Sequence, residues 1–97
     1  MDLIFHRLVQ RDLRIVLRYY EEEAGVELAD RFFDELGRLV REIEQNPQKF
    51  HLINDEIRRA NLERFPYHLL FKCTGEVIRV LVLRHDKQRP EFGLGQE

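Results

Sequence analysis

Cysteine, proline and long apolar runs are all scarce in this 97-residue sequence. The single cysteine, Cys73, excludes an internal disulfide bond and a cysteine-rich zinc module. No apolar run approaches the roughly 18 residues that a membrane-spanning helix needs, so no membrane association is expected. The first residues do not form a basic leader followed by a long apolar stretch. This argues against a signal peptide and predicts a cytoplasmic protein.

Sequence motifs for common cofactors are missing as well. There is no GxGxxG motif, no P-loop and no HExxH pair. The four histidines and the one cysteine do not have the spacing of metal ligands. We therefore expect neither a cofactor nor a bound metal.

What the sequence does contain is enough apolar material for one core. It is 43% hydrophobic and has seven phenylalanines, which is too much for a disordered chain. A domain of this size buries roughly two thirds of its unfolded surface, so it can fold alone with little margin. Residues 1–97 are expected to form a single domain, with about 93–97 as a loose tail.

The net charge of −2 conceals an asymmetry along the chain. Residues 1–56 carry 8 Lys and Arg against 13 Asp and Glu, whereas residues 57–97 carry 8 against 5. Thirteen of the 16 basic residues are arginine, which suits bidentate contacts to carboxylate or phosphate. The second half could therefore face an anionic partner, or the opposite charges could simply pair within one small domain.

Two amphipathic helices are predicted in the first half. Apolar residues recur at helical spacing over about residues 11–23, and again over about 26–45. Gly25 separates the two helices, and Asn46-Pro47 ends the second. Because the break is so short, the helices should form an antiparallel hairpin that covers one face of a sheet.

Strands are predicted on either side of this hairpin. Their ranges are 3–8, 57–62, 65–73 and 77–83. Short connections such as Thr74-Gly75-Glu76 should join the last three strands into an antiparallel meander. The predicted order is β-α-α-β-β-β, an α+β domain in which an N-terminal two-helix hairpin packs on a small antiparallel sheet.

The residues best suited to catalysis or to binding an anion are basic and lie in the last forty positions. They are Arg58, Arg59, Arg64, His68, Arg79, Arg84, His85 and Arg89. His85 follows an apolar strand, where it could act as general acid or base in phosphodiester cleavage while Arg84 stabilises the developing charge. The alternative is a strand-end histidine that is hydrogen-bonded to neighbouring backbone. Arg58 and Arg59 should point to opposite faces of their strand, so only one of them can enter a given pocket.

Several short segments, taken in order, resemble the RelE/ParE superfamily of bacterial type II toxins over about residues 3–92. The matching segments are Leu13 with Tyr19-Tyr20, Gly25, Leu28-Ala29-Asp30-Arg31-Phe32, Asn46-Pro47, Arg58-Arg59-Ala60-Asn61-Leu62, Arg64-Phe65-Pro66-Tyr67, and His85 with Arg89-Pro90. The resemblance implies a small sheet packed by an N-terminal helical hairpin. It also implies a toxin that is held inactive by a cognate antitoxin, whose flexible C-terminal segment wraps the toxin surface. The two proteins could then form a hetero-oligomer.

The superfamily divides by mechanism. RelE-like members cleave mRNA on the ribosome with basic residues and a C-terminal Tyr or His, and His85 with Arg84 would carry that chemistry here. In that case Arg58 or Arg59, together with Arg79, could also bind phosphate. ParE-like members poison DNA gyrase. The candidates for binding nucleic acid or the target are Arg58, Arg59, Arg64, Arg79 and Arg89. The tail after Leu83 contains no Tyr and the net charge is negative, which favours the ParE-like interpretation. An inactive family member remains a third alternative.

Overall fold

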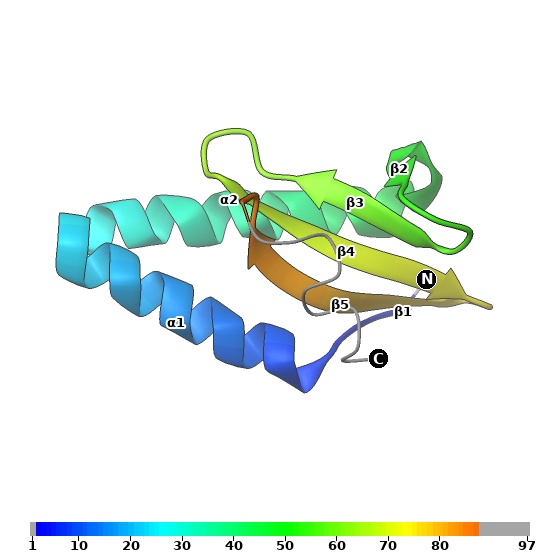
Figure 1. Cartoon of the computed structure of the whole chain (residues 1–97), viewed down its shortest axis with the longest axis horizontal. Helices are drawn as coiled ribbons and strands as arrows, with labels where there is room; N and C mark the ends of the chain where they lie inside the picture. The colour runs from blue at the N-terminus through cyan, green and yellow to red at the C-terminus, as the bar shows by residue number, and fades with distance from the viewer. Residues whose placement is uncertain (1, 88–97) are drawn as a thin grey trace.

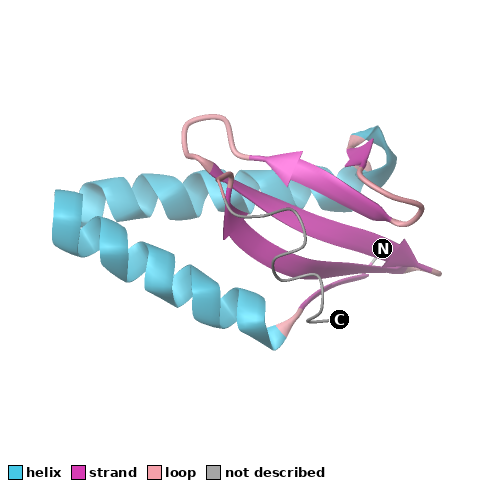
Figure 2. Cartoon of the chain, viewed as in Figure 1, coloured by secondary structure: helices cyan, strands magenta, loops and turns pink. Residues whose placement is uncertain are grey.

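A computed structural model describes residues 2–87 as a helical hairpin packed against a five-stranded sheet (Figures 1 and 2). The elements, in order, are β1 Asp2–Phe5, α1 Arg7–Ala24, α2 Val26–Gln45, the 3₁₀ turn η1 Pro47–Lys49, β2 His51–Leu52, β3 Ile57–Asn61, β4 Tyr67–Thr74 and β5 Val77–His85. The predicted α+β fold is confirmed. The tail expected at 93–97 lies outside the described residues. Between residues 2 and 87, neither helix has the length and apolar character to cross a bilayer.

The first helix begins earlier than the sequence pattern predicted. His6 has an extended backbone, and its Nδ1 accepts a hydrogen bond from the Leu8 N–H at 3.1 Å, which caps the helix. The predicted strand over 3–8 therefore ends at Phe5, and α1 starts at Arg7 instead of near Arg11. The cap was missed because histidine is not a common N-cap residue.

Gly25 is the turn between the helices, as predicted. Its φ of +96° lies in the left-handed region that glycine adopts without strain, and its N–H donates to the carbonyl of Glu21 at 3.1 Å. A single residue thus reverses the chain. The tip of the hairpin extends beyond the end of the sheet (Figure 1).

The strand order across the sheet is β1-β5-β4-β3-β2. Strands β3, β4 and β5 form the predicted antiparallel meander. The sheet is nevertheless mixed rather than wholly antiparallel, because β1 pairs parallel to β5. The helical hairpin and strands β2 to β4 lie between β1 and β5 in the chain, and together they supply the long connection that a parallel pairing requires. The short β2, which pairs with β3, was not predicted.

The main core lies between the helices and the sheet. Its largest fully buried side chains are Phe32 and Ile43 from α2 and Leu69, Phe71, Ile78 and Val80 from the sheet. A second, smaller cluster consists of Ile57, Leu70, Leu81 and Val82. Side chains alternate between the two faces along a strand, so Ile57 and Leu70 point away from the helices. Leu81 and Val82 are neighbours, and they share that face because Leu81 is the extra residue where Leu70 pairs with Val82 and Phe71 pairs with Val80. A bulge between Leu70 and Phe71 shifts the register of β4 against β5.

Candidate functional site

Pairing between β4 and β5 sorts the candidate residues onto the two faces of the sheet. His68 lies opposite Arg84, and Tyr67 lies opposite His85. Because side chains alternate along a strand, the first pair faces away from the helices and the second pair faces toward them. Arg84 and His85, neighbours in the sequence, are therefore separated by the sheet.

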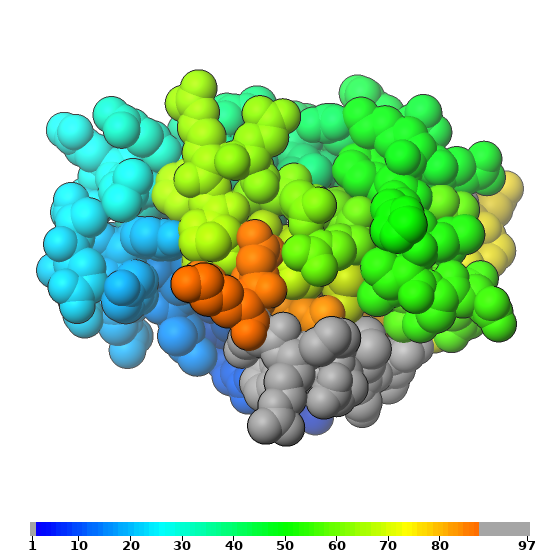
Figure 3. Space-filling view, turned by 45° about the horizontal axis from the view of Figure 1, so that its top comes forward, coloured from blue at the N-terminus to red at the C-terminus, as the bar shows by residue number. Residues whose placement is uncertain are grey.

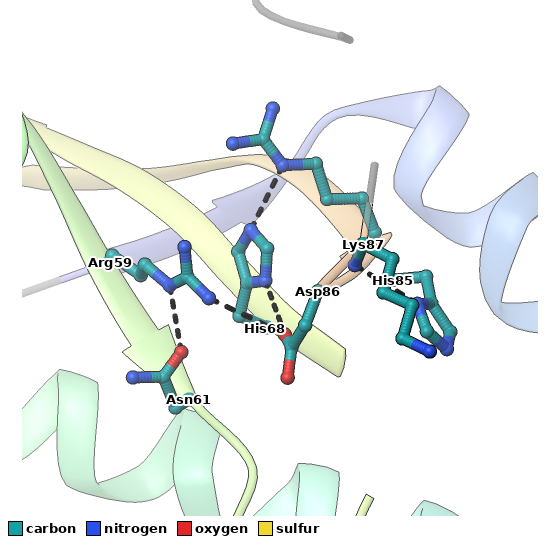
Figure 4. A network of polar contacts seen from close by, with 7 residues as sticks. Arg59, Asn61, His68, His85, Asp86 and Lys87 are labelled. Carbon is teal, nitrogen blue, oxygen red and sulfur yellow. Dashed lines mark hydrogen bonds and ion pairs between the residues drawn. The ribbon is translucent and has the colours of Figure 1, made fainter. Parts of the chain in front are cut away.

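A polar network surrounds His68 on the face away from the helices (Figure 4). His68 is only 1% exposed. Its Nδ1 lies 2.7 Å from Asp86 Oδ1, and the Nε–H of Arg84 donates to its Nε2 at 2.9 Å. Arg84 is buried beside it, with 5% of its surface exposed.

The two partners of His68 fix the position of its proton. A guanidinium can only donate and a carboxylate can only accept. The nitrogen facing Arg84 must therefore carry a lone pair, while the nitrogen facing Asp86 carries the hydrogen. His68 is consequently a neutral imidazole that relays a hydrogen bond from Arg84 to Asp86.

Arg59 extends this network from the neighbouring strand β3. Its Nε donates to Asn61 Oδ1 at 2.8 Å, and its Nη2 lies 3.5 Å from Asp86 Oδ1 (Figure 4). One carboxylate thus contacts both Arg59 and His68. We call the four residues Arg59, His68, Arg84 and Asp86 the His68 network.

Burial is the main influence on the ionisation of His68, and it lowers the pKa of the imidazole below the ordinary value of 6.5. The hydrogen bond to Asp86 acts in the opposite direction, while the nearby charges of Arg59 and Arg84 lower the pKa further. The neutral form is therefore favoured by burial and by both arginines.

His85 occupies a different environment. Its Nδ1 accepts a hydrogen bond from the Lys87 N–H at 3.1 Å, and its ring meets that of Tyr67 edge-on, with centroids 5.0 Å apart. These contacts agree with the alternative of a strand-end histidine bound to neighbouring backbone. Residues 85–87 lie between the C-terminal half of α1 and the segment that follows β3 (Figure 3).

The other candidate arginines within residues 2–87 do not join the His68 network. Arg58 turns to the opposite side of β3 from Arg59, as predicted, and its Nη1 donates to the carbonyls of Phe50 at 2.7 Å and Gln48 at 3.3 Å. Arg79 is exposed on β5, opposite Lys72. Arg64 is exposed in the loop after β3, and Arg89 lies outside the described residues.

A buried carboxylate on α2 holds the loop that carries Arg64. Glu35 is 9% exposed, and its Oε2 accepts hydrogen bonds from the backbone N–H groups of Glu63 at 2.5 Å and Arg64 at 3.3 Å. Beside it is a cavity of about 350 Å³ that Arg38 and Phe65 help to line. The sequence offered no sign of this contact, because Glu35 looks like one more charged residue on a polar helix face.

Sequence reasoning also missed the role of Asp86 and the position of His68. His68 was grouped with seven other basic residues, and only the register of β4 against β5 shows that it meets Arg84. Within residues 2–87, no cluster of three or more His, Cys, Asp or Glu side chains is placed to hold a metal ion.

Comparison with known proteins agrees with this fold. Residues 3–90 match the family described as "ParE toxin of type II toxin-antitoxin system, parDE". Toxin ParE2 of Mycobacterium tuberculosis, in strains CDC 1551 and H37Rv, is 28% identical over 86 residues, which cover 88% of this chain and 81% of the relative. A solved structure titled "Chromosomal ParDE TA system from P. aeruginosa" superposes with a TM-score of 0.78 and 23% identity. That match covers 88% of this chain and 95% of the other.

The match over residues 3–90 defines the class: a toxin of a type II toxin–antitoxin system. The chain belongs to the ParE toxin family. The resemblance to the ParE-like branch of the superfamily is thereby confirmed. Membership implies an antitoxin as its protein partner.

Proposed function

We propose that this toxin acts in the cytoplasm by binding and poisoning DNA gyrase. The observation that carries the proposal is the match of residues 3–90 to the ParE family, whose type of action is directed at gyrase. The 28% identity to Toxin ParE2 over most of both chains supports the same assignment.

The geometry of the sheet favours this proposal over cleavage of mRNA. A nuclease site built from Arg84 and His85 would need both side chains at one phosphate. Here Arg84 faces away from the helices beside His68, whereas His85 faces them beside Tyr67. The two groups cannot meet one phosphodiester without rearrangement of β5.

Of the four target-binding candidates that lie within residues 2–87, two have side chains that are available for a partner. Arg64 and Arg79 are exposed, and within residues 2–87 no hydrogen bond or ion pair engages either guanidinium. Arg58 and Arg59 are both held by neighbouring groups. Arg64 and Arg79 are therefore the first contacts that we propose, and Arg89 remains a candidate from the sequence.

The test is DNA cleavage by gyrase in vitro. Purified toxin, gyrase and supercoiled plasmid are incubated with ATP, and covalent complexes are trapped with detergent. The proposal expects linear DNA that accumulates with toxin and disappears when the cognate antitoxin is added. Arg64→Ala and Arg79→Ala should each weaken the effect, whereas Arg14→Ala, an exposed arginine on α1, should not.

Two results would contradict the proposal. Transcripts cut within codons on translating ribosomes, with gyrase unaffected, would assign the toxin to the mRNA-cleaving branch. A chain that folds and binds its antitoxin but affects neither gyrase nor translation would be an inactive member of the family.

A further inference from the structure

Two adjoining cavities lie where α2 meets the loop after β3, and Glu35 helps to line both of them. Their volumes are about 350 and about 210 Å³. The loop lies beside the middle of α2 (Figure 1). Arg38 of the helix and Arg64 of the loop also line both cavities, and Arg31 lines the larger one. We call Arg31, Arg38 and Arg64 the arginine site.

The guanidinium groups of the arginine site have no partner among residues 2–87. No hydrogen bond or ion pair engages any of them there, and Arg64 is bonded only through its backbone N–H. Two of the carboxylates that line the cavities are used elsewhere, because Glu35 accepts from the loop and Glu42 accepts from Lys49 Nζ at 2.6 Å. The site therefore presents guanidinium donors that are available to bind an anion.

The backbone around the arginine site is held in place on both sides. Arg31 and Arg38 are two turns apart on α2, so their side chains leave the helix on the same side. Glu35 accepts hydrogen bonds from the backbone N–H groups of Glu63 and Arg64, which fixes the loop. An anion that binds here therefore orders less of the chain than one that binds between mobile segments.

The larger cavity also has an apolar wall. Leu28 is half-buried and Phe65 is buried, and both residues line this cavity. A carboxylate that reaches the arginines brings its neighbouring groups against these apolar side chains. A partner that presents an acidic side chain next to an apolar one therefore gains from both parts of the cavity.

The balance of charge favours a protein over a nucleic acid as the partner. In the larger cavity the three arginines face two carboxylates, Asp34 and Glu35, which leaves one unit of positive charge for one carboxylate to neutralise. A DNA backbone carries one negative charge per about 1.7 Å of its axis. It would also meet the carboxylates of Glu42 and Glu63, which line the smaller cavity and repel phosphate.

We propose that the arginine site binds an acidic side chain of gyrase, with an apolar neighbour packed against Leu28 and Phe65. The toxin thereby contacts the protein part of its target and not the DNA. This proposal rests on gyrase as the target, and it adds Arg31 and Arg38 to Arg64 as contact residues.

The first experiment measures binding in the absence of DNA. Gyrase holoenzyme is immobilised, and the affinity of the purified toxin is measured by biolayer interferometry. The wild-type toxin should bind, and Arg38→Ala and Arg64→Ala should each weaken binding roughly tenfold to hundredfold, because each removes a hydrogen bond between charged groups. Arg31→Ala should weaken binding less, since Arg31 lines one cavity only.

The matched control is Arg41→Ala. Arg41 is an exposed arginine on the same helix that lines neither cavity, so its removal should leave the affinity unchanged. The guanidinium groups of the arginine site are not bonded to any other part of residues 2–87. Their variants should therefore melt at the temperature of the wild type, as measured by circular dichroism.

Two further variants test the chemistry of the contact at Arg38. Arg38→Lys keeps the positive charge but loses the planar pair of donors, whereas Arg38→Gln removes the charge. If a carboxylate binds there, Arg38→Lys should retain part of the affinity and Arg38→Gln should behave like Arg38→Ala. Wild-type affinity in Arg38→Gln would overturn the proposal.

Plasmid cleavage with the same variants separates this inference from the proposed function. The trapped cleavage product should decrease in the order in which binding weakens. If the wild type traps cleaved plasmid and Arg38→Ala traps as much, gyrase remains the target and the arginine site is wrong. A wild-type toxin that neither binds gyrase nor traps cleaved plasmid would overturn both.

A requirement for DNA would also overturn the inference. Toxin that binds gyrase only when DNA is present would contact the nucleic acid. The same conclusion would follow if the toxin bound a DNA fragment alone and Arg38→Ala abolished that binding.

Discussion

At the scale of single residues, the most consequential polar group outside the His68 network is Glu35. It lies on α2 among buried apolar side chains, yet its Oε2 accepts hydrogen bonds from two backbone N–H groups of the loop after β3. Hydrogen bonds to a charged acceptor are stronger than those between neutral groups. This contact fixes the loop that presents Arg64.

We predict that Glu35→Ala lowers the free energy of unfolding by about 1–3 kcal/mol, because it leaves two partly buried amide donors without their acceptor. Urea denaturation followed by circular dichroism measures the change. Asp34→Ala is the matched control, since Asp34 is the exposed neighbour on the same helix, and it should stay within about 0.5 kcal/mol of the wild type. Equal losses in both variants would refute the role given to Glu35.

His68 and Glu35 show why residue roles were only partly predictable. Each makes its contacts with residues at least 16 positions away in the sequence. Composition could flag His68 as one of eight basic candidates, but it gave no means to choose among them. The separation of Arg58 from Arg59 was predictable, because it follows from the alternation of a single strand.

At the scale of elements, the contact between hairpin and sheet is dominated by aromatic rings. Phe32 of α2 is fully buried and meets Tyr20, Phe65 and Tyr67 at centroid distances of 5.6, 5.1 and 5.5 Å. Tyr20 of α1 completes the group through its contact with Phe65 at 5.4 Å. Both helices, β4 and the preceding loop are thus joined at one place.

Burial in this cluster makes the packing sensitive to alkaline pH. Burial is the largest cause that raises the pKa of Tyr20 and of Tyr67 above the ordinary 10.0. In the unfolded chain these phenols ionise near pH 10, whereas in the folded chain they keep their protons to higher pH. Their contribution to stability is therefore complete below about pH 10 and is lost as the pH rises from there through the folded values.

We predict that Tyr20→Phe makes the alkaline loss of stability shallower, because one of the two raised phenols is removed. Urea midpoints at about pH 9 and about pH 11, on either side of the ordinary tyrosine pKa, measure the difference. Tyr19→Phe changes the adjacent tyrosine, whose side chain is 55% exposed, and should change the slope less than Tyr20→Phe does, because the charge of Tyr19 is a smaller cause than burial in raising the pKa of Tyr20 and of Tyr67. A slope that is identical in all three proteins would contradict the prediction.

The elements themselves were predicted unevenly. The bounds of α2 at Val26 and Gln45 agree with the sequence, because a glycine and an Asn-Pro pair mark its two ends. The start of α1 was placed four residues late, because the cap is a histidine whose side chain accepts from Leu8. The two-residue β2 is too short to leave a periodic pattern and exists through its pairing with β3.

At the scale of the whole molecule, a chain of 97 residues has a small core and limited stability of its own. Several large apolar side chains remain exposed on the hairpin, among them Ile15 at 59%, Val26 at 61% and Phe33 at 54%. A partner that binds only the folded toxin stabilises it by mass action. We expect the cognate antitoxin to be such a partner.

We predict that saturating cognate antitoxin raises the melting temperature of the toxin by roughly 10–20 °C. The reason is that a ligand at one hundred times its Kd adds about 2.7 kcal/mol to the free energy of unfolding. Each kcal/mol raises the melting temperature of a domain of this size by roughly 4–8 °C. Differential scanning calorimetry of the toxin with and without antitoxin makes the measurement. A non-cognate antitoxin is the control, and an unchanged melting temperature with the cognate partner would exclude this coupling.

The sequence by itself determined what depends on local periodicity and local breaks. It specified two amphipathic helices joined at Gly25, an antiparallel meander and the resemblance to ParE toxins, since each of these is encoded in neighbouring residues. Only the tertiary structure decided the parallel pairing of β1 with β5 and the register of β4 against β5. That register sets His68 between Arg84 and Asp86 and separates Arg84 from His85. Such contacts join residues far apart in the chain, where the side chains that must meet leave no common pattern in the sequence.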